Sequence, residues 1–519
     1  MQRQTYVITN YGVEENCQEL QTNQIQAVFD LCRDNGGVVV VPKGRFYTGG
    51  LRMWSDTTLY LKEGAELFGS DECEDYTVFT IPEGVEVRSD LEMISQYVAG
   101  KLGDTYRRAI LSIYGENNVA IIGEKDSVID GANCYDADGE EGYRGPHGIY
   151  MTGCTNVLLQ GYTIQHSGNF LHEVNNCTNV TMRNVTCLGG SDGIHMHCTT
   201  NTLIEKCLFK TGDDCVGGIN INGLHVRDCI LNTSCNLFRI GGVHILVENC
   251  YAYGPGYYPH RMTIVRGKKD YLPREEGRHN MLYVIDYFAS SDYPYEPSRD
   301  IVFRNCIIEN AKSMLSYHAD REPLQAGTHL CELTLENVRF TGLHESADVR
   351  ASAKEPLIVK MKNVSVFFRD DLENTGLFDG KDEHTSLVEE TVTDDMQEMK
   401  EVHNSCSALA AQIREYIYLH MEENISVKRL CDVFFISKNK LYNISNRWFG
   451  MTIGNYITSV RIEEAKRLLF MTEMPVSQIG LMVGISDYNY FARFFKSYTG
   501  MSPLKYRKST RISIQKGDE

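Results

Sequence analysis

The sequence lacks three features that would place the chain in a membrane or outside a reducing compartment. It has no run of about eighteen apolar residues, the length that a membrane-spanning helix needs. Its first residues, MQRQTYVITNYG, have neither the basic start nor the apolar stretch of a secretion signal. It also has no C-x-x-C pair, so its 17 cysteines are expected to be free thiols rather than zinc ligands or disulfides. These absences predict a cytoplasmic protein without a membrane partner, a metal or a cofactor.

The charge of the chain is unevenly distributed. Its 519 residues exceed what one core usually holds, so two or three domains are expected. From Ser405 to the end, 16 Lys and Arg residues stand against 10 Asp and Glu, whereas the earlier residues have 35 against 59. The net charge of −18 is thus the sum of a basic C-terminal part and a strongly acidic N-terminal part. This distribution predicts two functions on one chain, one of which involves a nucleic acid.

The first two thirds of the chain repeat a short pattern at a regular interval. The segments NVLLQGYTI from Asn156, NVTMRNVTC from Asn179 and NTLIEKCLF from Asn201 alternate apolar and polar residues and end in turn-forming residues. Inward-type positions recur at intervals of 22, 22 and 21 residues, at Val185, Cys207, Cys229 and Cys250. A helical period is missing here, so the repeat predicts a parallel β-helix whose coils stack on one another. An amphipathic helix from about Thr22 to Arg33 is expected to cap its first coil.

Two acidic motifs occur on consecutive repeats. Asp192 lies in GGSDGIHMH, and Asp213 and Asp214 lie in KTGDDCVGG, 21 and 22 residues further on. One coil of the repeat would therefore bring the three carboxylates together. Such crowding raises the pKa of at least one carboxyl, which suits a general acid beside a general base. Asp-Gly and Gly-Asp pairs also make ordinary turns between strands, but two such pairs one coil apart favour a catalytic site.

Residues 5 to 368 resemble family 28 glycoside hydrolases, the polygalacturonase family. That family folds as a right-handed, pectin-lyase-like β-helix and hydrolyses glycosidic bonds with inversion. Its motifs are N-T-D, then D-D about one coil later, then G-H-G and R-x-K. The resemblance implies that Asp213 is the general acid, and that Asp192 and Asp214 activate water. Inverting chemistry predicts an acid and a base about 6.5–9.5 Å apart.

The chain departs from the family pattern around these carboxylates. Gly190 and Ser191 replace N-T, CNLFRIGG replaces the G-H-G segment, and R-x-K survives only loosely as Arg266–Gly267–Lys268. The expected substrate-binding residues are His195, His197, Asn236, Arg239, Arg266 and Lys268. Two interpretations remain open: the β-helix hydrolyses an oligosaccharide, possibly one that contains uronic acid, or it only senses such a sugar.

From about Ala410 the periodicity becomes helical. Ser426 and Ser437 are N-cap candidates that open two helices about one helix-turn-helix spacing apart. A longer helix follows, and a second unit begins near Pro475, with Ser486 as the expected N-cap of its second helix. Apolar and exposed polar positions alternate in the second helix of each unit. The exposed residues expected to contact DNA are Asn439, Lys440, Asn443, Arg447, Asn489, Arg493 and Lys496.

This C-terminal part resembles the AraC/XylS family of bacterial transcription regulators. The run GISDYNYFARFFKSYTGMSPLKYR contains the family's YF-x-R-x-FK signature, followed by Gly500, Pro503 and Tyr506–Arg507. The resemblance implies that two recognition helices, held by a rigid linker helix, enter successive major grooves of double-stranded DNA about 34 Å apart. RNA polymerase is then a possible further partner.

These patterns divide the chain into four parts. Residues 1–368 are expected to form the β-helix, and residues 406–510 an all-α double helix-turn-helix domain, with a tail at 511–519. Between them, 369–405 is rich in Asp and Glu and poor in aromatics, which is typical of a solvated linker. The sequence thus predicts a transcription regulator with a carbohydrate-active β-helix fused to its DNA-binding module.

Overall fold

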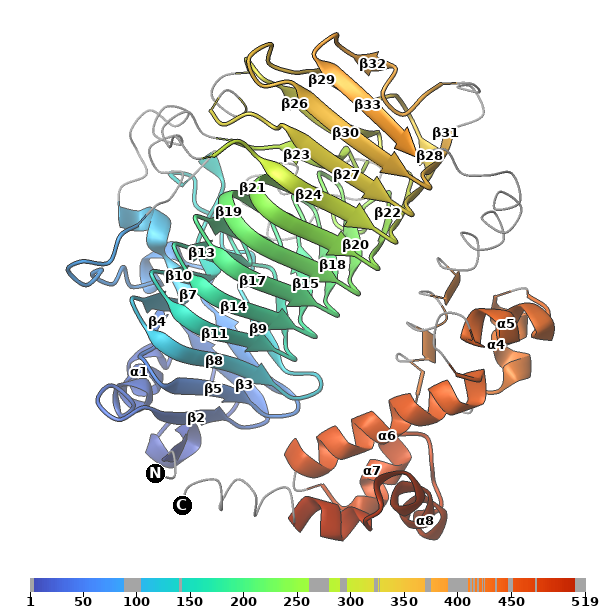
Figure 1. Ribbon diagram of the computed structural model, residues 1–519. Coiled ribbons are helices and arrows are strands. Elements are labelled where there is room, and N and C mark those ends of the chain that lie inside the picture. The colour runs from blue at the N-terminus through green and yellow to red at the C-terminus, as the bar shows by residue number, and fades with distance from the viewer. Residues whose placement is uncertain are drawn as a thin grey trace. The chain divides into compact units, whose positions relative to one another are not determined.

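The computed structural model describes two parts of the chain (Figure 1). Its described residues are 4–87, 104–139, 142–260, 280–289, 296–321, 325, 327–368 and 375–390, and most of 409–508. The chain divides into two compact units, with the boundary between Thr391 and Val392. Each unit has its own hydrophobic core and is described by itself.

The N-terminal unit is a right-handed parallel β-helix. Each complete coil contributes one strand to each of three faces, and every pairing between its named strands is parallel. Ile194 pairs with Val216, and Val216 with Phe238, so one coil takes 22 residues, as the repeat predicts. Figure 1 shows the coils stacked as successive layers from the blue N-terminal end to the orange end. The predicted fold is therefore confirmed.

The strands of this unit are divided among the three faces. The first, called the site face, holds β4 (Leu51–Arg52), β7 (Ala109–Tyr114), β10 (His147–Thr152), β13 (His172–Asn175), β16 (Ile194–His197), the starts of β19 (Val216–Arg227) and β21 (Phe238–Glu248), β23 (Tyr283–Tyr287), β26 (Ser313–His318), β29 (Asp348–Arg350) and β32 (Gly380–Lys381). The second holds β1 (Thr5–Val7), β2 (Gly37–Val41), β5 (Thr57–Leu61), β8 (Asn117–Gly123), β11 (Thr155–Gln160), β14 (Thr178–Arg183), β17 (Thr200–Glu205), the ends of β19 and β21, β24 (Arg299–Arg304), β27 (Glu332–Glu336), β30 (Leu357–Lys362) and β33 (Thr385–Glu390). The third holds β3 (Gly44–Thr48), β6 (Ala65–Gly69), β9 (Val128–Asp130), β12 (Thr163–Gln165), β15 (Thr186–Gly189), β18 (Leu208–Thr211), β20 (Ile230–Thr233), β22 (Tyr251–Tyr253), β25 (Ile307–Glu309), β28 (Arg339–Leu343) and β31 (Ser365–Phe368).

An asparagine ladder holds successive coils in register. Asn118, Asn156, Asn179 and Asn201 all have φ near +57°, a left-handed conformation that asparagine tolerates better than most residues. Asn156, Asn179 and Asn201 each donate an Nδ2 hydrogen to the Oδ1 of the asparagine one coil earlier, at 3.1, 3.0 and 2.7 Å. The Asn that begins each sequence repeat is therefore a structural residue, and it fixes where every coil turns.

The inward-type positions of the repeat form a buried stack that includes three cysteine thiols. Strand register brings Val185, Cys207, Cys229 and Cys250 into consecutive coils, and each is at most 5% exposed. The cysteines in the described part of the chain are free thiols. Cys207 and Cys250 fill the core as small apolar side chains, because burial raises the pKa of both thiols well above the ordinary value and keeps them protonated.

One helix precedes the complete coils. Helix α1 (Thr22–Asp30) buries Ile25, Val28 and Phe29 in the same core as the strands. It ends three residues before the predicted end at Arg33, where the chain continues as turns. The short 3-10 helices are η1 (Ile8–Tyr11), η2 (Cys73–Asp75) and η3 (Asp104–Arg107).

The predicted acidic linker starts too early. Residues in 375–390 complete the last coil, because β32 pairs with β29, and β33 pairs with β30 from Leu357↔Thr385 to Lys362↔Glu390. Leu387 packs against the core, and the pairing with β30 holds this segment as a strand despite its charge. The rest of the predicted linker lies outside the described residues.

The C-terminal unit is helical and contains two similar halves. Its named helices are α4 (Val427–Val433), α5 (Lys438–Ile444), α6 (Ile453–Met471), α7 (Val476–Met482) and α8 (Tyr488–Thr499). Ile453 and Ile457 of α6 join the core of the first half, whereas Ala465 and Leu469 join that of the second. Helix α6 therefore links the two halves as a single rod about 28 Å long. None of the helices in the described part of the chain is long and apolar enough to cross a membrane.

Candidate functional site

The three predicted carboxylates lie together at the edge of the site face. Asp192 precedes β16, and Asp213 and Asp214 precede β19. The pairing of Ile194 with Val216 places Asp192 next to Asp214 in the coil above it. One oxygen of each carboxylate lies within 4.8 Å of the others, and each residue is at most 5% exposed. The sequence-predicted cluster is therefore present, but these oxygens are closer than the separation of about 6.5–9.5 Å expected for an inverting pair.

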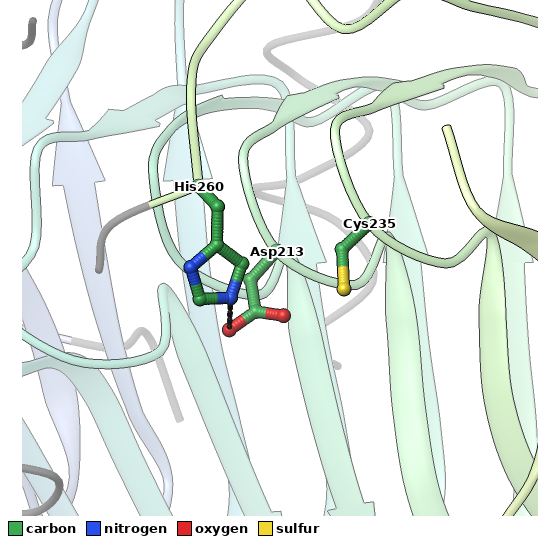
Figure 2. A group of neighbouring side chains, drawn as sticks. All are labelled: Asp213, Cys235 and His260. Carbon is green, nitrogen blue, oxygen red and sulfur yellow. Dashed lines mark ion pairs between the residues drawn. The ribbon is translucent and has the colours of Figure 1, made fainter. Parts of the chain in front are cut away.

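Two basic side chains, Arg144 and His260, converge on Asp213. The Nη2 of Arg144 lies 2.7 Å, and the Nε2 of His260 lies 3.0 Å, from the same Oδ2 atom. Figure 2 shows the imidazole of His260 beside the Asp213 carboxylate and the Sγ of Cys235 on the other side. Arg144 also donates to Oδ1 of Asn169 at 3.3 Å, and its guanidinium lies 5.0 Å from the ring of Phe170. Asp213 is thus held in a buried, charge-assisted pair.

Asp192 and Asp214 have different partners. The Nδ1 of His195 lies 2.7 Å from Oδ2 of Asp192, and the His195 ring stacks on Phe170 at 4.4 Å with an interplanar angle of 8°. Asn236 donates its Nδ2 hydrogen to Oδ1 of Asp214 at 2.8 Å. Its backbone N–H donates to the same oxygen at 3.2 Å. His195 and Asn236 therefore contact the carboxylates, and their binding of substrate stays a prediction.

These surroundings separate the pKa values of the three carboxyls. Burial, together with the neighbouring charges of Asp192 and Asp213, raises the pKa of Asp214 well above its usual value. Burial and the charge of Asp213 also raise the pKa of Asp192, against the opposing effect of His195. Although burial alone would raise the pKa of Asp213, His260 and Arg144 lower it well below its usual value. As pH rises, Asp213 is therefore the first of the three carboxyls to ionise, and Asp214 binds a proton more strongly than a free carboxyl does.

The remaining sugar-binding candidates lie at different distances from the cluster. Arg239 is on β21, with its Nε 3.7 Å from Asp286 and its guanidinium 4.4 Å from the ring of Phe288. The charges of Asp214 and Asp286 outweigh burial and raise the pKa of Arg239, so it faces the cluster as a cation. His197 lies two residues after His195 on β16 and is buried, with its Nε2 3.8 Å from Oε1 of Glu173. Arg266 and Lys268 lie outside the described residues.

Sequence reasoning missed Arg144 and His260. His260 follows Asn236 by 24 residues, about one coil, so a search for a histidine about two repeats beyond Asp213 and Asp214 could have found it. Arg144 has no such signal, because it lies in a loop before β10 that belongs to no repeat. Only the fold brings Arg144 to Asp213, 69 residues away.

One side of the cluster is covered by aromatic residues. Tyr114 and Tyr150 lie on β7 and β10 next to core residues, so alternation points them outward from the coil. They pack with Tyr106, and Phe79 and Ile81 pack on the same group. Burial lowers the pKa of His147, on the same strand as Tyr150, to about 3. Side chains therefore fill the site face on the coils of β7 and β10, which precede the carboxylates. On the coils that follow them, Arg239 and Asp286 are partly exposed.

The donor atoms near Asp213 include a set that could bind a metal ion. Oxygen, sulfur and nitrogen atoms of Asp213, Cys235 and His260 lie within 4.8 Å of one another (Figure 2). Zinc accepts these three ligand types. The guanidinium of Arg144, 2.7 Å from Asp213, already neutralises that carboxylate and disfavours a second cation there.

The DNA-binding candidates lie on α5 and α8. Asn439, Lys440 and Asn443 are exposed on α5, whereas Leu441 and Ile444 are buried. Ser426 and Ser437 cap α4 and α5 by accepting hydrogen bonds from Arg429 N and Lys440 N. Arg447 lies outside the described residues.

Helix α8 presents the second set. Asn489, Arg493 and Lys496 are exposed, and Phe491 and Phe495 are buried against α7. The predicted cap is wrong by one residue: Asp487, not Ser486, accepts the hydrogen bond from Tyr490 N at 2.7 Å. A carboxylate at this end also interacts favourably with the helix dipole.

Comparisons with known proteins identify both parts. Residues 430–509 match the family model of a helix-turn-helix domain, and residues 70–236 match that of glycosyl hydrolases family 28. The chain therefore joins a family 28 glycoside hydrolase domain to an AraC-type DNA-binding regulator domain.

Relatives match one part or the other. The arabinose operon regulatory protein of Escherichia coli (strain K12) is 28% identical over 124 residues, which are 24% of this chain and 42% of that protein. The exo-poly-alpha-D-galacturonosidase of Dickeya chrysanthemi is 26% identical over 256 residues, 40% of this chain and 41% of that protein. The chain spans less than half the length of these curated relatives.

A solved structure has the same fold as the N-terminal unit. The family 28 exopolygalacturonase of Yersinia enterocolitica superposes with a TM-score of 0.51 at 17% identity, covering 75% of this chain and 79% of that one. At this identity the likeness concerns the β-helix fold alone.

Proposed function

We propose that this chain is a transcription regulator whose β-helix domain hydrolyses the end of a uronic-acid-containing oligosaccharide in the cytoplasm. The observation that carries the proposal is the buried cluster of Asp192, Asp213 and Asp214, in which the pKa of Asp213 is lowered and that of Asp214 is raised. Glycoside hydrolysis needs an acid that protonates the leaving oxygen and a carboxylate that acts on the other side of the bond.

The contacts favour an exchange of the roles that the family resemblance implies. A general acid must carry a proton, and Asp213 cannot hold one while Arg144 and His260 contact its Oδ2. Asp214 is buried and its pKa is raised well above the usual value, so it is the acid in this proposal. Asp213 and Asp192 are then the carboxylates that orient and activate water.

The surroundings of the cluster favour an end-acting enzyme. Among the described residues, the aromatic group around Tyr106 and Tyr150 fills the site face on one side, so we expect a chain of sugars to extend toward β21 and β23. There Arg239 is partly exposed and positively charged, and a guanidinium binds a sugar carboxylate well. The relative from Dickeya chrysanthemi is named for removing galacturonate units from chain ends, which agrees with this proposal.

Two substrates with different leaving groups test the roles. The purified full-length chain is assayed for product release from digalacturonic acid and from 4-nitrophenyl galacturonide, whose leaving group needs little protonation. Asp214→Asn should lower turnover of the disaccharide by about 10²–10⁴-fold, with a much smaller loss on the nitrophenyl substrate. Asp213→Asn should impair both substrates equally.

Asp348→Asn is the control, because Asp348 is an exposed residue that pairs with His318, away from the cluster. It should behave as the wild type does. The assigned roles fail if Asp213→Asn, rather than Asp214→Asn, is rescued by the nitrophenyl leaving group.

A second function is favoured by the ion pair of Arg144 with Asp213. If that pair is permanent, the cluster binds a sugar without turnover, and the domain acts as a sensor for the helix-turn-helix module. The wild type would then turn over neither substrate but would still bind digalacturonic acid in calorimetry. Under either function, the isolated C-terminal domain is expected to bind promoter DNA, with RNA polymerase as a further partner.

A further inference from the structure

A separate cavity of about 420 Å³ opens on the β-helix away from the carboxylates. It lies where the site face turns into the second face, beyond the ends of β16 and β23, and within the long strands β19 and β21. Its volume falls in the range of about 300–1,000 Å³ that small-molecule sites usually have. The carboxylates precede β16 and β19, whereas the cavity is lined by residues after β16 and in the middle of β19. Along these strands, roughly six extended residues, or about 20 Å, separate the backbone of the carboxylates from that of the lining.

Irregular backbone in β19 and β21 forms the floor of this cavity. The register between these strands shifts between Gly218 and Ile221, which indicates a β-bulge. Gly242 has a φ of +152°, and a Cβ there would lie 2.1 Å from the carbonyl oxygen of Ile221. Only glycine therefore allows the two strands to approach in this way, and the bulge leaves a hollow where neighbouring coils are flat.

The lining is polar and carries little charge. Amides and hydroxyls come from Asn176, Thr200, Asn220, Asn222, Ser298 and Thr328. The Nδ2 atom of Asn220 is buried and has no hydrogen-bond partner among the described residues. His244 and Glu296, the titratable imidazole and carboxylate of the lining, pair with Asp300 at 2.8 Å and Arg299 at 2.5 Å. No Lys or Arg occurs among the described residues of the lining.

The cavity shares one wall with the carboxylate site. Phe288 lines the cavity, and the guanidinium of Arg239 lies 4.4 Å from the same ring. A ligand in the cavity would therefore contact a side chain that also supports the cation near Asp214.

From this lining we infer that the cavity binds a neutral mono- or disaccharide, as an effector site distinct from the catalytic cluster. Amides and hydroxyls pair with sugar hydroxyls, and the unpaired Nδ2 of Asn220 supplies a donor for one of them. A uronate would leave its carboxylate without a cation in this cavity, whereas Arg239 at the cluster offers one. The inference does not depend on turnover, since a sensing or a hydrolysing domain can contain this site.

Calorimetry on the full-length chain tests the inference. The neutral probes are D-galactose, L-rhamnose, D-xylose and D-galactobiose, and D-galacturonate is the charged probe. At least one neutral probe should bind with saturation. Thr200→Trp should weaken that binding at least about tenfold, because an exposed indole then fills the cavity. Asn222→Ala removes an exposed amide from the lining and should weaken binding in the same direction.

Two controls separate this site from the cluster. Thr178→Trp is the matched control, because Thr178 pairs with Thr200 one coil earlier and does not line the cavity. It should bind the neutral probe as the wild type does, and so should Asp214→Asn. The inference is wrong if no neutral probe binds, if Thr200→Trp and Asn222→Ala leave binding unchanged, or if Asp214→Asn abolishes it. Loss of turnover alone would bear on the proposed function and not on this site.

Discussion

Asp213 and Asp214 are adjacent in sequence, yet replacing each by asparagine should shift stability in opposite directions. Asp213→Asn leaves the guanidinium of Arg144, 6% exposed, without its charged partner. Removing one partner of a buried ion pair typically costs about 3–5 kcal/mol. For a unit of this size, Arg3–Thr391, an unfolding entropy of about 2.1 cal/mol/K per residue gives about 0.8 kcal/mol/K, so Tm should fall by about 4–6 °C.

Asp214→Asn should keep or raise Tm. The new amide oxygen can still accept from Asn236, and the amide resembles the protonated acid. Because the folded-state pKa of Asp214 is raised, the stability from its bound proton is full below the unfolded-state pKa and is lost as pH rises through the folded-state pKa. Asparagine loses no proton, so its advantage over the wild type should grow toward alkaline pH.

The pH dependence of Asp213→Asn should run the other way. The pKa of Asp213 is lowered in the fold, so its stabilising effect is present above the unfolded-state pKa and is lost as pH falls through the folded-state pKa. The deficit of this variant should therefore be full at neutral pH and shrink in acid. Thermal unfolding followed by circular dichroism at several pH values measures both effects. Equal destabilisation by the two variants at neutral pH would refute the placement of the proton on Asp214.

Three further results are expected. Turnover should persist above the ordinary titration range of a carboxyl and fall as pH rises through the raised pKa of Asp214. A pH–rate profile measures this. A profile in which turnover falls only on the acidic side, below about pH 5, would contradict the assignment of Asp214 as the acid. Arg493→Ala or Asn443→Ala should cost about 1–3 kcal/mol of specific DNA binding if the side chain contacts a base, as measured by electrophoretic shift with the isolated residues 405–519. Unchanged specific affinity in both variants would contradict the predicted DNA contacts. Limited proteolysis should cut first within 391–408 rather than 375–390, because the latter segment is paired with β29 and β30, and early cleavage before Glu390 would argue against that pairing.

Features that depend on interactions between residues close in sequence were predicted well, whereas those that depend on distant residues were missed. The 22-residue repeat predicted the coil, since Asn156, Asn179 and Asn201 mark the same left-handed turn in each coil. The alternation predicted for the second helix of each unit is present on α5, where Leu441 and Ile444 are buried. The last coil was missed, because the charge of 375–390 hides two strands whose stability comes from pairing with β29 and β30 rather than from their own composition.

The sequence by itself determined the stacking of Asp192 beneath Asp214, because a fixed coil length converts a 22-residue separation into spatial contact. It also determined the two helical halves, because apolar periodicity identifies buried faces locally. Only the tertiary structure decided the state of the carboxylates. Arg144 reaches Asp213 from a loop outside the repeat, 69 residues away along the chain, and no local pattern encodes that approach. A pKa depends on every charge and on the burial within a few ångströms, so the position of the proton is a property of the folded chain.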